Sequence, residues 1–227
     1  MKTQIHSLKF GINQCYIIRQ KGTIMIDGGP GQKKVIRKFR KYLKEFSIQP
    51  DELELIILTH GDFDHVGSAK SIKELTGAKI AIHEIDKPNM EEGIFNWPPG
   101  QNAYGRFLHR LFYPVMKNIS FTTCKADITL TEDEFPLYRF GIEGKVIYTP
   151  GHTQGSVSVL LDTGDAFVGC LSHNGFPFRR KPNLPIFAEN IEQIKESWHQ
   201  IIAKGAKTIY PGHGQSFDVE EIEKYIN

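Results

Sequence analysis

The sequence lacks several features that would place it at once in a class of proteins. It has three cysteines in 227 residues, too few and too scattered for a disulfide framework, which fits a reducing compartment. No apolar run approaches the roughly 20 residues that a membrane-spanning helix needs, and the start of the chain lacks the apolar core of a signal peptide. These absences predict a cytoplasmic protein with no membrane partner.

An excess of charge is also missing. Lysine and arginine number 28 and aspartate and glutamate 26, which gives a formal net charge of +2. No strong electrostatic field therefore indicates nucleic acid as a partner, so we expect a small-molecule substrate, and a homodimer stays open. The length fits one large domain over residues 1–227, because no linker or low-complexity tract divides the chain.

Short apolar strands alternate with amphipathic helices over most of the sequence. The predicted strands lie at 15–18, 23–26, 53–58, 78–82, 127–130, 145–149, 157–161, 166–168 and 208–210. The predicted helices lie at 33–46, 68–75, 190–203 and 219–226. Because strands and helices alternate, the pattern favours a layered α/β fold with an open sheet that helices cover.

One stretch, residues 87–123, breaks this alternation. It is rich in proline, glycine and aromatic side chains, among them Phe95, Trp97 and Phe112. We predict a partly helical lid or loop excursion for it. Its aromatic side chains can wall an apolar pocket or bury a dimer contact, and the sequence does not choose between these two uses.

A dense group of metal-binding side chains follows the predicted strand 53–58. Within seven residues, the run from Thr59 holds two imidazoles and two carboxylates. They are His60, Asp62, Asp64 and His65. Two more histidines, His152 and His213, each follow an apolar strand and a Pro-Gly turn. Imidazole and carboxylate ligands suit zinc or iron, and strand ends are where layered α/β proteins build sites, so we predict a transition-metal centre.

The chain resembles the metallo-β-lactamase superfamily in five motifs that occur in the same order. The motifs are Asp27-Gly28 after a strand pair, the loop His60 to His65, the loop Thr149 to Ser156, Gly169-Cys170, and Pro211-Gly212-His213. The resemblance covers nearly the whole chain. It implies an αβ/βα sandwich of two mixed β-sheets flanked by helices, with a dinuclear metal site at one edge. We expect two zinc ions there, with iron as the alternative.

Two positions depart from the family pattern, and the resemblance implies that both are metal ligands. Asp62 stands where the family has its second histidine, and Cys170 stands where it has a bridging aspartate. A carboxylate and a thiolate both bind zinc, so neither change removes a donor. The implied first site is His60, Asp62 and His152. The implied second site is Asp64, His65 and His213, with Cys170 bridging or bound to that metal alone.

Four residues have a second interpretation. Asp62 can point to solvent and cap the following helix, and Cys170 can be a small apolar filler. Asp27 is either a carboxylate that holds a histidine tautomer or a turn residue with a local hydrogen bond, and the turn is slightly favoured. His173 follows Cys170 closely and can contact a substrate, although a surface loop is the expected place for it.

The resemblance implies a metal-dependent hydrolase of a small ester, thioester, lactone or amide. A metal-bound hydroxide would attack the substrate, with Asp64 as the catalytic carboxylate that orients it. Two alternatives stay open. Two histidines and Asp62 also match the ligand set of non-haem iron enzymes, which favours an iron-dependent oxygenase or redox enzyme. The changes at Asp62 and Cys170 also fit a metal-poor member without catalytic activity.

Overall fold

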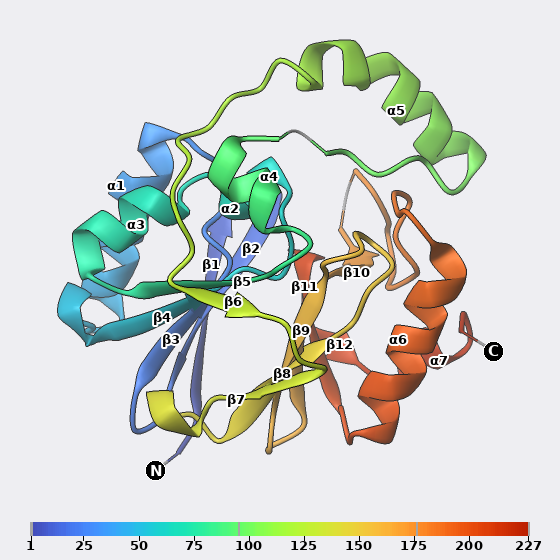
Figure 1. The fold of residues 1–227 in the computed structure, drawn as a ribbon. Coiled ribbons are helices and arrows are strands. Elements are labelled where there is room, and N and C mark those ends of the chain that lie inside the picture. Colours follow the sequence, from blue (N-terminus) through green and yellow to red (C-terminus); the bar gives the residue numbers. More distant parts are fainter. Residues whose placement is uncertain (1, 95, 176, 227) are drawn as a thin grey trace.

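The strands of this chain form two sheets that face each other, with helices on both outer faces (Figure 1). A computed structural model describes residues 2–94, 96–175 and 177–226, so that Phe95 of the insert lies outside the described residues. Each sheet has six strands of mixed direction. The predicted αβ/βα sandwich is therefore confirmed.

The first sheet starts with antiparallel strands and continues with parallel ones. Its order is β1 (Gln4–Phe10), β2 (Asn13–Arg19), β3 (Thr23–Ile26), β4 (Leu53–Ile57), β5 (Lys79–His83) and β6 (Ile128–Leu130). Strands β1 to β3 pair antiparallel, and β3 to β6 pair parallel. Because β3 and β4 run in the same direction, the loops that follow them leave the same edge of the sheet.

Two helices cover the outer face of the first sheet, as the periodicity predicts. They are α1 (Lys33–Glu45) and α3 (Ala69–Thr76), and between them lie η1 (Pro50–Glu52) and α2 (Phe63–Val66). In α1, the buried residues Val35 and Phe39 recur at helical spacing and join the outer core with Ile17 of β2. The neighbouring Tyr16 and Ile18 belong to the core between the sheets, because strand side chains alternate between faces.

The second sheet has the order β12 (Phe217–Asp218), β11 (Thr208–Gly214), β10 (Asp165–Asn174), β9 (Val157–Leu161), β8 (Gly144–Tyr148) and β7 (Glu134–Pro136), and η2 (Tyr138–Phe140) follows β7. Its outer face is covered by α6 (Ile191–Ala203) and α7 (Glu220–Glu223). Trp198 of α6 is fully buried there and donates a hydrogen bond to the Leu171 carbonyl oxygen at 3.1 Å.

The insert at 87–123 is partly helical, as predicted, with α4 (Lys87–Glu92) and α5 (Ala103–Met116). Figure 1 shows α5 at the top of the molecule, above α4 and β10. Backbone hydrogen bonds from Gln101 to Ile186 and from Ala188 to Pro99 attach the segment before α5 to the chain that leads into α6. Within the described residues, no helix has both the length and the apolarity needed to cross a bilayer.

Several elements differ from the prediction. β1, β7 and β12 were not predicted, β10 covers ten residues instead of 166–168, β11 continues to Gly214 instead of ending at 210, and α7 is shorter than the predicted helix 219–226. β10 continues because its register with β11 shifts on both sides of Gly169, where φ is +52°. Such bulges bend a strand and redirect the side chains that follow. The added part of β10 carries Cys170 and His173, so the bulge helps to position the candidate site.

Candidate metal centre

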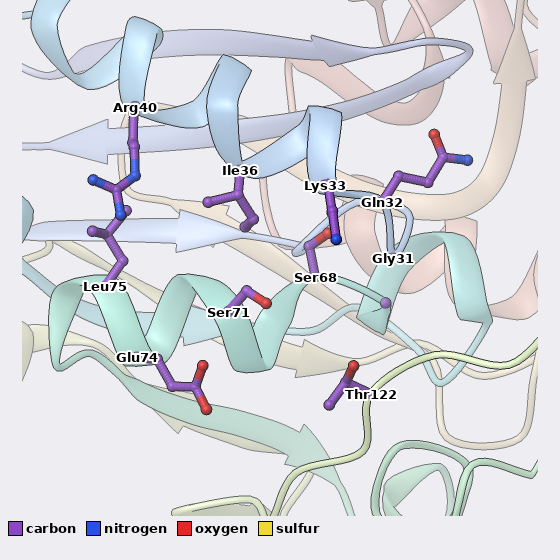
Figure 2. A pocket seen from close by; sticks show the side chains of 11 residues that line it. Gly31, Gln32, Lys33, Ile36, Arg40, Ser68, Ser71, Glu74, Leu75 and Thr122 are labelled. Atoms are coloured by element: carbon purple, nitrogen blue, oxygen red, sulfur yellow. The ribbon is translucent and has the colours of Figure 1, made fainter.

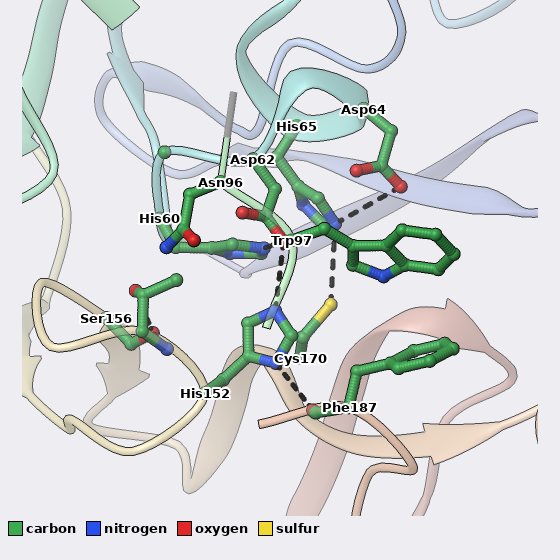
Figure 3. A network of polar contacts seen from close by, with 12 residues as sticks. His60, Asp62, Asp64, His65, Asn96, Trp97, His152, Ser156, Cys170 and Phe187 are labelled. Carbon is green, nitrogen blue, oxygen red and sulfur yellow. Dashed lines mark hydrogen bonds and ion pairs between the residues drawn. The ribbon is translucent and has the colours of Figure 1, made fainter. Parts of the chain in front are cut away.

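The candidate site lies at one edge of the two sheets, where loops from both meet. The backbone N–H of Val157 donates a hydrogen bond to the carbonyl oxygen of Thr59 at 2.8 Å, which joins the loop after β4 to β9. All seven predicted ligands gather at this edge. They are His60, Asp62, Asp64, His65, His152, Cys170 and His213. Figure 3 shows side chains from the first sheet's loop facing His152 and Cys170 of the second.

Two of the histidines are fixed by backbone carbonyl groups. Nδ1 of His152 lies 3.0 Å from the carbonyl oxygen of Phe187, and Nδ1 of His213 lies 3.2 Å from that of Ile12. A carbonyl oxygen can only accept, so Nδ1 must carry the proton in both rings. Each Nε2 is then left with a lone pair, as a metal ligand requires.

The other two histidines are fixed through Asp27. Its Oδ2 lies 2.7 Å from Nδ1 of His65, and its Oδ1 accepts the backbone N–H of Thr59 at 2.8 Å. The Thr59 hydroxyl, 3.0 Å from both Asp27 oxygens, lies 2.9 Å from Nδ1 of His60. The slightly favoured interpretation of Asp27 as a local turn residue is therefore wrong, because its carboxylate reaches across to the next strand's loop.

Cys170 stands between two groups of donors. One ligand atom each from His60, His152 and Cys170 lie within 4.8 Å of one another, and the same holds for His65, Cys170 and His213. The Cys170 sulfur lies 3.4 Å from Nε2 of His65. The thiol therefore belongs to both groups of donors.

The two loop carboxylates divide between these groups. Oδ2 of Asp62 lies 3.2 Å from Nε2 of His152 and 3.6 Å from Nε2 of His60. Asp62 precedes α2, but its side chain makes no capping hydrogen bond, so the capping alternative is wrong. Oδ2 of Asp64 lies 3.5 Å from Nε2 of His213. The grouping agrees with the two implied ligand sets, and metal binding itself stays a prediction.

The donors of the first group fit a cation. His60 Nε2 and Asp62 Oδ1 are buried and have no hydrogen-bond partner within the described residues. A buried polar atom without a partner costs about 1–3 kcal/mol. Because both atoms offer lone pairs, one metal ion would satisfy them together.

The electrostatics of the site also favour a cation. Burial opposes ionisation of the Cys170 thiol, but the imidazoles around it, His213 and His65 foremost, outweigh burial and hold its pKa well below the ordinary value. Burial likewise opposes the charged form of His65, but the anionic groups around it, Asp27 foremost, together outweigh burial and raise the pKa of His65. The anionic side chains thus attract positive charge, which protons or a metal ion can supply.

Two supporting residues were not identified from the sequence. Asp86 is buried and accepts hydrogen bonds from the backbone N–H of Gly61 at 2.7 Å and from the Thr153 hydroxyl at 2.7 Å. It thereby joins the loops that carry His60 and His152. Asn13 donates its side-chain N–H to Asp64 Oδ2 at 2.8 Å. Neither lies in a ligand motif; the position of Asp86, just after a predicted strand, was the only available signal.

His173 lies in β10 and is 2% exposed, so the expectation of a surface loop was wrong. Its ring centroid lies 5.3 Å from that of His213 and 4.8 Å from that of Phe178. Neither ring nitrogen has a hydrogen-bond partner among the described residues. Burial lowers the pKa of His173 to about 4, which keeps the ring neutral at pH 7.

A cavity of about 110 Å³ opens onto the donors, and His173 lines it together with Cys170 and His213. Its rim is apolar, formed by Ile12, Phe63, Trp97, Met116, Phe178 and Phe187. The insert thus walls the pocket through Trp97 and Met116, which is one of its two predicted uses. Aromatic walls around a few polar groups are typical of small-molecule sites.

Two glycines of the motifs are required by close approach at the site. A Cβ on Gly169 would lie 2.6 Å from the Thr59 hydroxyl oxygen, and one on Gly212 would lie 2.7 Å from Cε1 of His65. Real Cβ atoms do not approach other atoms so closely. Gly169-Cys170 and Pro211-Gly212-His213 therefore keep glycine because the ligand loops of the two sheets pack against each other.

A larger groove of about 640 Å³ lies away from the site, between α1 and α3 (Figure 2). Lys33, Arg40 and Glu74 line it among other residues. No histidine or cysteine is among the described residues that line it. It lacks the converging donors of the metal centre, so the smaller cavity is the candidate site.

Known proteins share this architecture and these motifs. A family model described as the metallo-beta-lactamase superfamily matches residues 8–213. The chain belongs to this superfamily. The match contains all five motifs, from Asp27-Gly28 to Pro211-Gly212-His213.

Curated relatives carry hydrolase names at low identity. The probable metallo-hydrolase MJ0888 of Methanocaldococcus jannaschii is 27% identical over 208 residues, which are 89% of this chain and 88% of the relative. The probable metallo-hydrolase YqgX of Bacillus subtilis is 27% identical over 158 residues, 69% of this chain. The match spans less than two thirds of YqgX and of the Mycobacterium leprae relative ML0493, at 63% and 66% of their lengths.

Solved structures show the same fold. The BLEG-1 B3 metallo-beta-lactamase has a TM-score of 0.69 at 20% identity, covering 96% of this chain and 95% of that one. The archaeal superfamily protein ST1585 of Sulfolobus tokodaii has a TM-score of 0.65 at 22% identity, covering 95% and 82%. The family and the relatives together support a metal-binding hydrolase. They do not identify its substrate.

Proposed function

We propose that this protein is a hydrolase of a small ester, thioester, lactone or amide that uses two zinc ions. The observation that carries the proposal is the orientation of the four histidines. Each has Nδ1 held within the protein, by a carbonyl oxygen, the Asp27 carboxylate or the Thr59 hydroxyl. Their Nε2 atoms are therefore free to bind metal around Cys170.

We assign the donors to two ions on the basis of their grouping. The first ion would be held by His60, Asp62 and His152. The second would be held by Asp64, His65 and His213, with Cys170 shared between the two ions. Zinc bound there would lower the pKa of a coordinated water to about 7 and polarise the substrate carbonyl.

The chain's own residues orient the reactants. Asn13 holds Asp64 by its side-chain N–H at 2.8 Å, and Asp64 is half-buried at the cavity, so its free oxygen can align the attacking water. His173 brings a neutral ring with an unpartnered N–H into the same cavity. We assign it the role of donating a hydrogen bond to a substrate oxygen.

The cavity limits the part of the substrate next to the scissile bond. A volume of about 110 Å³ admits only a small group, and the apolar rim with Trp97 and Phe187 excludes water from it. We therefore expect a compact, uncharged acyl group at this position. The leaving group would extend past Ile12 toward solvent, since that residue is 48% exposed.

A second candidate function is an iron-dependent oxygenase or redox reaction. The observation that favours it is the carboxylate of Asp62 beside His60 and His152, a set of two histidines and one carboxylate. A third reading, a metal-poor protein without catalytic activity, follows if the thiol of Cys170 serves only packing.

We also propose a reducing, cytoplasmic location. The three cysteines Cys15, Cys124 and Cys170 are all free. A thiolate at Cys170 can bind metal only while it is reduced, so an oxidising compartment would disable the proposed site.

Metal analysis joined to an activity panel separates these functions. The protein is purified without added metal, its zinc and iron are measured, and it is assayed with esters, thioesters, lactones and amides. Zinc with hydrolysis supports the first function, and iron with oxygen consumption supports the second. Protein that takes up neither metal at micromolar concentration contradicts both. His199→Ala, which changes an exposed histidine outside the site, is the matched control for His152→Ala.

A further inference from the structure

Helix α5 exposes a continuous apolar stripe. Tyr104, Phe107, Leu111 and Val115 are 46%, 61%, 53% and 69% exposed, and their spacing of three or four residues places them on one face. Phe112 and Tyr113 of the same helix are also exposed, at 46% and 40%. Outside α5, the exposed large apolar side chains of the described residues stand singly, as Tyr138 does. Single exposed apolar residues are ordinary, but a stripe along one helix marks an interaction surface.

The inward face of α5 is already used by the protein. Gly105 is its only buried residue, and a Cβ there would lie 2.4 Å from the carbonyl oxygen of Ile186. Met116, at the end of the helix, lines the cavity of the metal centre. The stripe lies on the opposite face. The Tyr104 hydroxyl donates a hydrogen bond to the Pro177 carbonyl oxygen at 3.2 Å, whereas Phe107, Leu111 and Val115 are more than half exposed.

Basic side chains accompany the stripe. Arg106 and Arg110 lie one turn apart along its flank, are exposed, and form no ion pair with the described residues. In the sequence, no acidic residue occurs between Glu92 and Asp127, whereas four lysines and arginines do. The chain as a whole has a net charge of only +2, which conceals this local excess.

We propose that α5 docks the protein onto an anionic lipid surface. The stripe would enter the interface between headgroups and acyl chains, and Arg106 and Arg110 would contact the headgroups, which is how basic amphipathic helices lie on membranes. A second copy of the chain fits less well, because pairing two such faces brings like charges together. The proposal departs from the expectation of no membrane partner, which rested on net charge and the absence of a spanning helix.

Docking would also orient the metal centre. Trp97 and Met116 of the insert line its cavity, so the cavity lies beside the inward face of α5. Docking itself does not depend on the proposed hydrolase activity, so the two can fail separately.

The test is sedimentation of the full chain with vesicles. One set contains phosphatidylcholine with phosphatidylglycerol, and the other contains phosphatidylcholine alone. We expect binding to the anionic set that weakens as salt rises, because screening acts on exposed charge. The double change Phe107→Ser with Leu111→Ser, and separately Arg106→Gln with Arg110→Gln, should each weaken binding at least about tenfold.

The controls change matched residues outside α5. Tyr138→Ser removes an aromatic side chain that is 65% exposed, and Lys33→Gln with Lys34→Gln removes two exposed charges of α1. Both should bind vesicles as the unchanged protein does. The proposal is overturned if neither vesicle set is bound, or if the α5 variants bind as well as the controls. It is also overturned if the stripe variants instead abolish a concentration-dependent dimer seen by light scattering. Should the serine variant fail to fold, the arginine variant alone decides.

Discussion

The metal centre and α5 differ in how closely contacts within the protein fix their side chains. At the centre, Nδ1 of each of the four ligand histidines lies within hydrogen-bond distance of a partner in the protein. Gly169 and Gly212 allow the ligand loops to pack closely. In α5, one residue of fourteen is buried. Contacts within the protein therefore fix the side chains of the metal centre closely. They fix the outer face of α5 much less, so that face is available for a role at the surface.

The largest effect is expected where the centre loses a donor. His152→Ala removes a donor near Asp62 and Cys170. Metal content and activity should both fall by more than about 100-fold, because substitutions of residues that only support metal ligands already cost up to about 100-fold. Elemental analysis and hydrolysis assays measure this. His199→Ala should leave both unchanged, and an active, metal-loaded His152→Ala protein would show that the site is assigned wrongly.

The proposed role of Cys170 as a shared ligand can be tested by a pair of substitutions. Cys170→Ala should lower metal content strongly, whereas Cys170→Asp should retain it because a carboxylate also binds zinc. Cobalt-loaded protein should show thiolate-to-metal absorption in the near ultraviolet that both variants lose. If Cys170 only fills space, Cys170→Ala will keep the metal, and Cys170→Asp will destabilise the fold by burying a charge.

The next effect concerns residues that hold the ligands. Asp27→Asn should weaken metal affinity about 10- to 100-fold, because the amide cannot replace the carboxylate toward both His65 and the Thr59 hydroxyl. A competitive chelator titration measures this. Asp51→Asn, at an exposed aspartate, is the control. Equal affinity in both variants would leave Asp27 with a structural role only.

A smaller effect is expected at His173. If the His173 ring donates one hydrogen bond to a substrate oxygen, His173→Ala should lower kcat/KM by about tenfold. This change corresponds to roughly 1.4 kcal/mol of lost binding to the transition state. Metal content should stay the same, which separates this role from a ligand role. His173→Gln, which keeps an N–H donor, should recover part of the activity. Loss of metal in His173→Ala would mean that the ring helps to hold the ions.

The smallest effect is expected for the stability of α5. Phe107→Ala should change the free energy of unfolding by no more than about 0.5 kcal/mol, because its side chain is 61% exposed. Trp198→Ala, at a fully buried residue of α6, should cost about 3–5 kcal/mol. Urea unfolding measures both. A large loss of stability in Phe107→Ala would show that the stripe packs within the protein after all.

The fold was largely predictable because its long elements have strong periodicity. Helices α1 and α6 begin and end within one residue of the predicted limits 33–46 and 190–203. β1 was missed because exposed polar residues interrupt its apolar pattern, as expected for an edge strand. β10 was predicted too short because the bulge at Gly169 resembles a turn in sequence.

The candidate site was predictable as a set of donors and less so as a geometry. The density of histidines and aspartates at strand ends identified six donors, from His60 to His213, and the family resemblance added Cys170. The supporting roles of Asp27 and Asp86 come from contacts between segments far apart in the chain, which local sequence patterns do not contain. The same reason explains the error at His173, which the extension of β10 buries.

We propose above all that the converging histidines and Cys170 hold two metal ions. The measurement that tests it most directly is the metal-to-protein ratio of the unchanged protein, purified without added metal and then equilibrated with micromolar zinc. We expect about two zinc ions per chain, as in a two-metal hydrolytic site. A ratio near zero that zinc does not raise would contradict it.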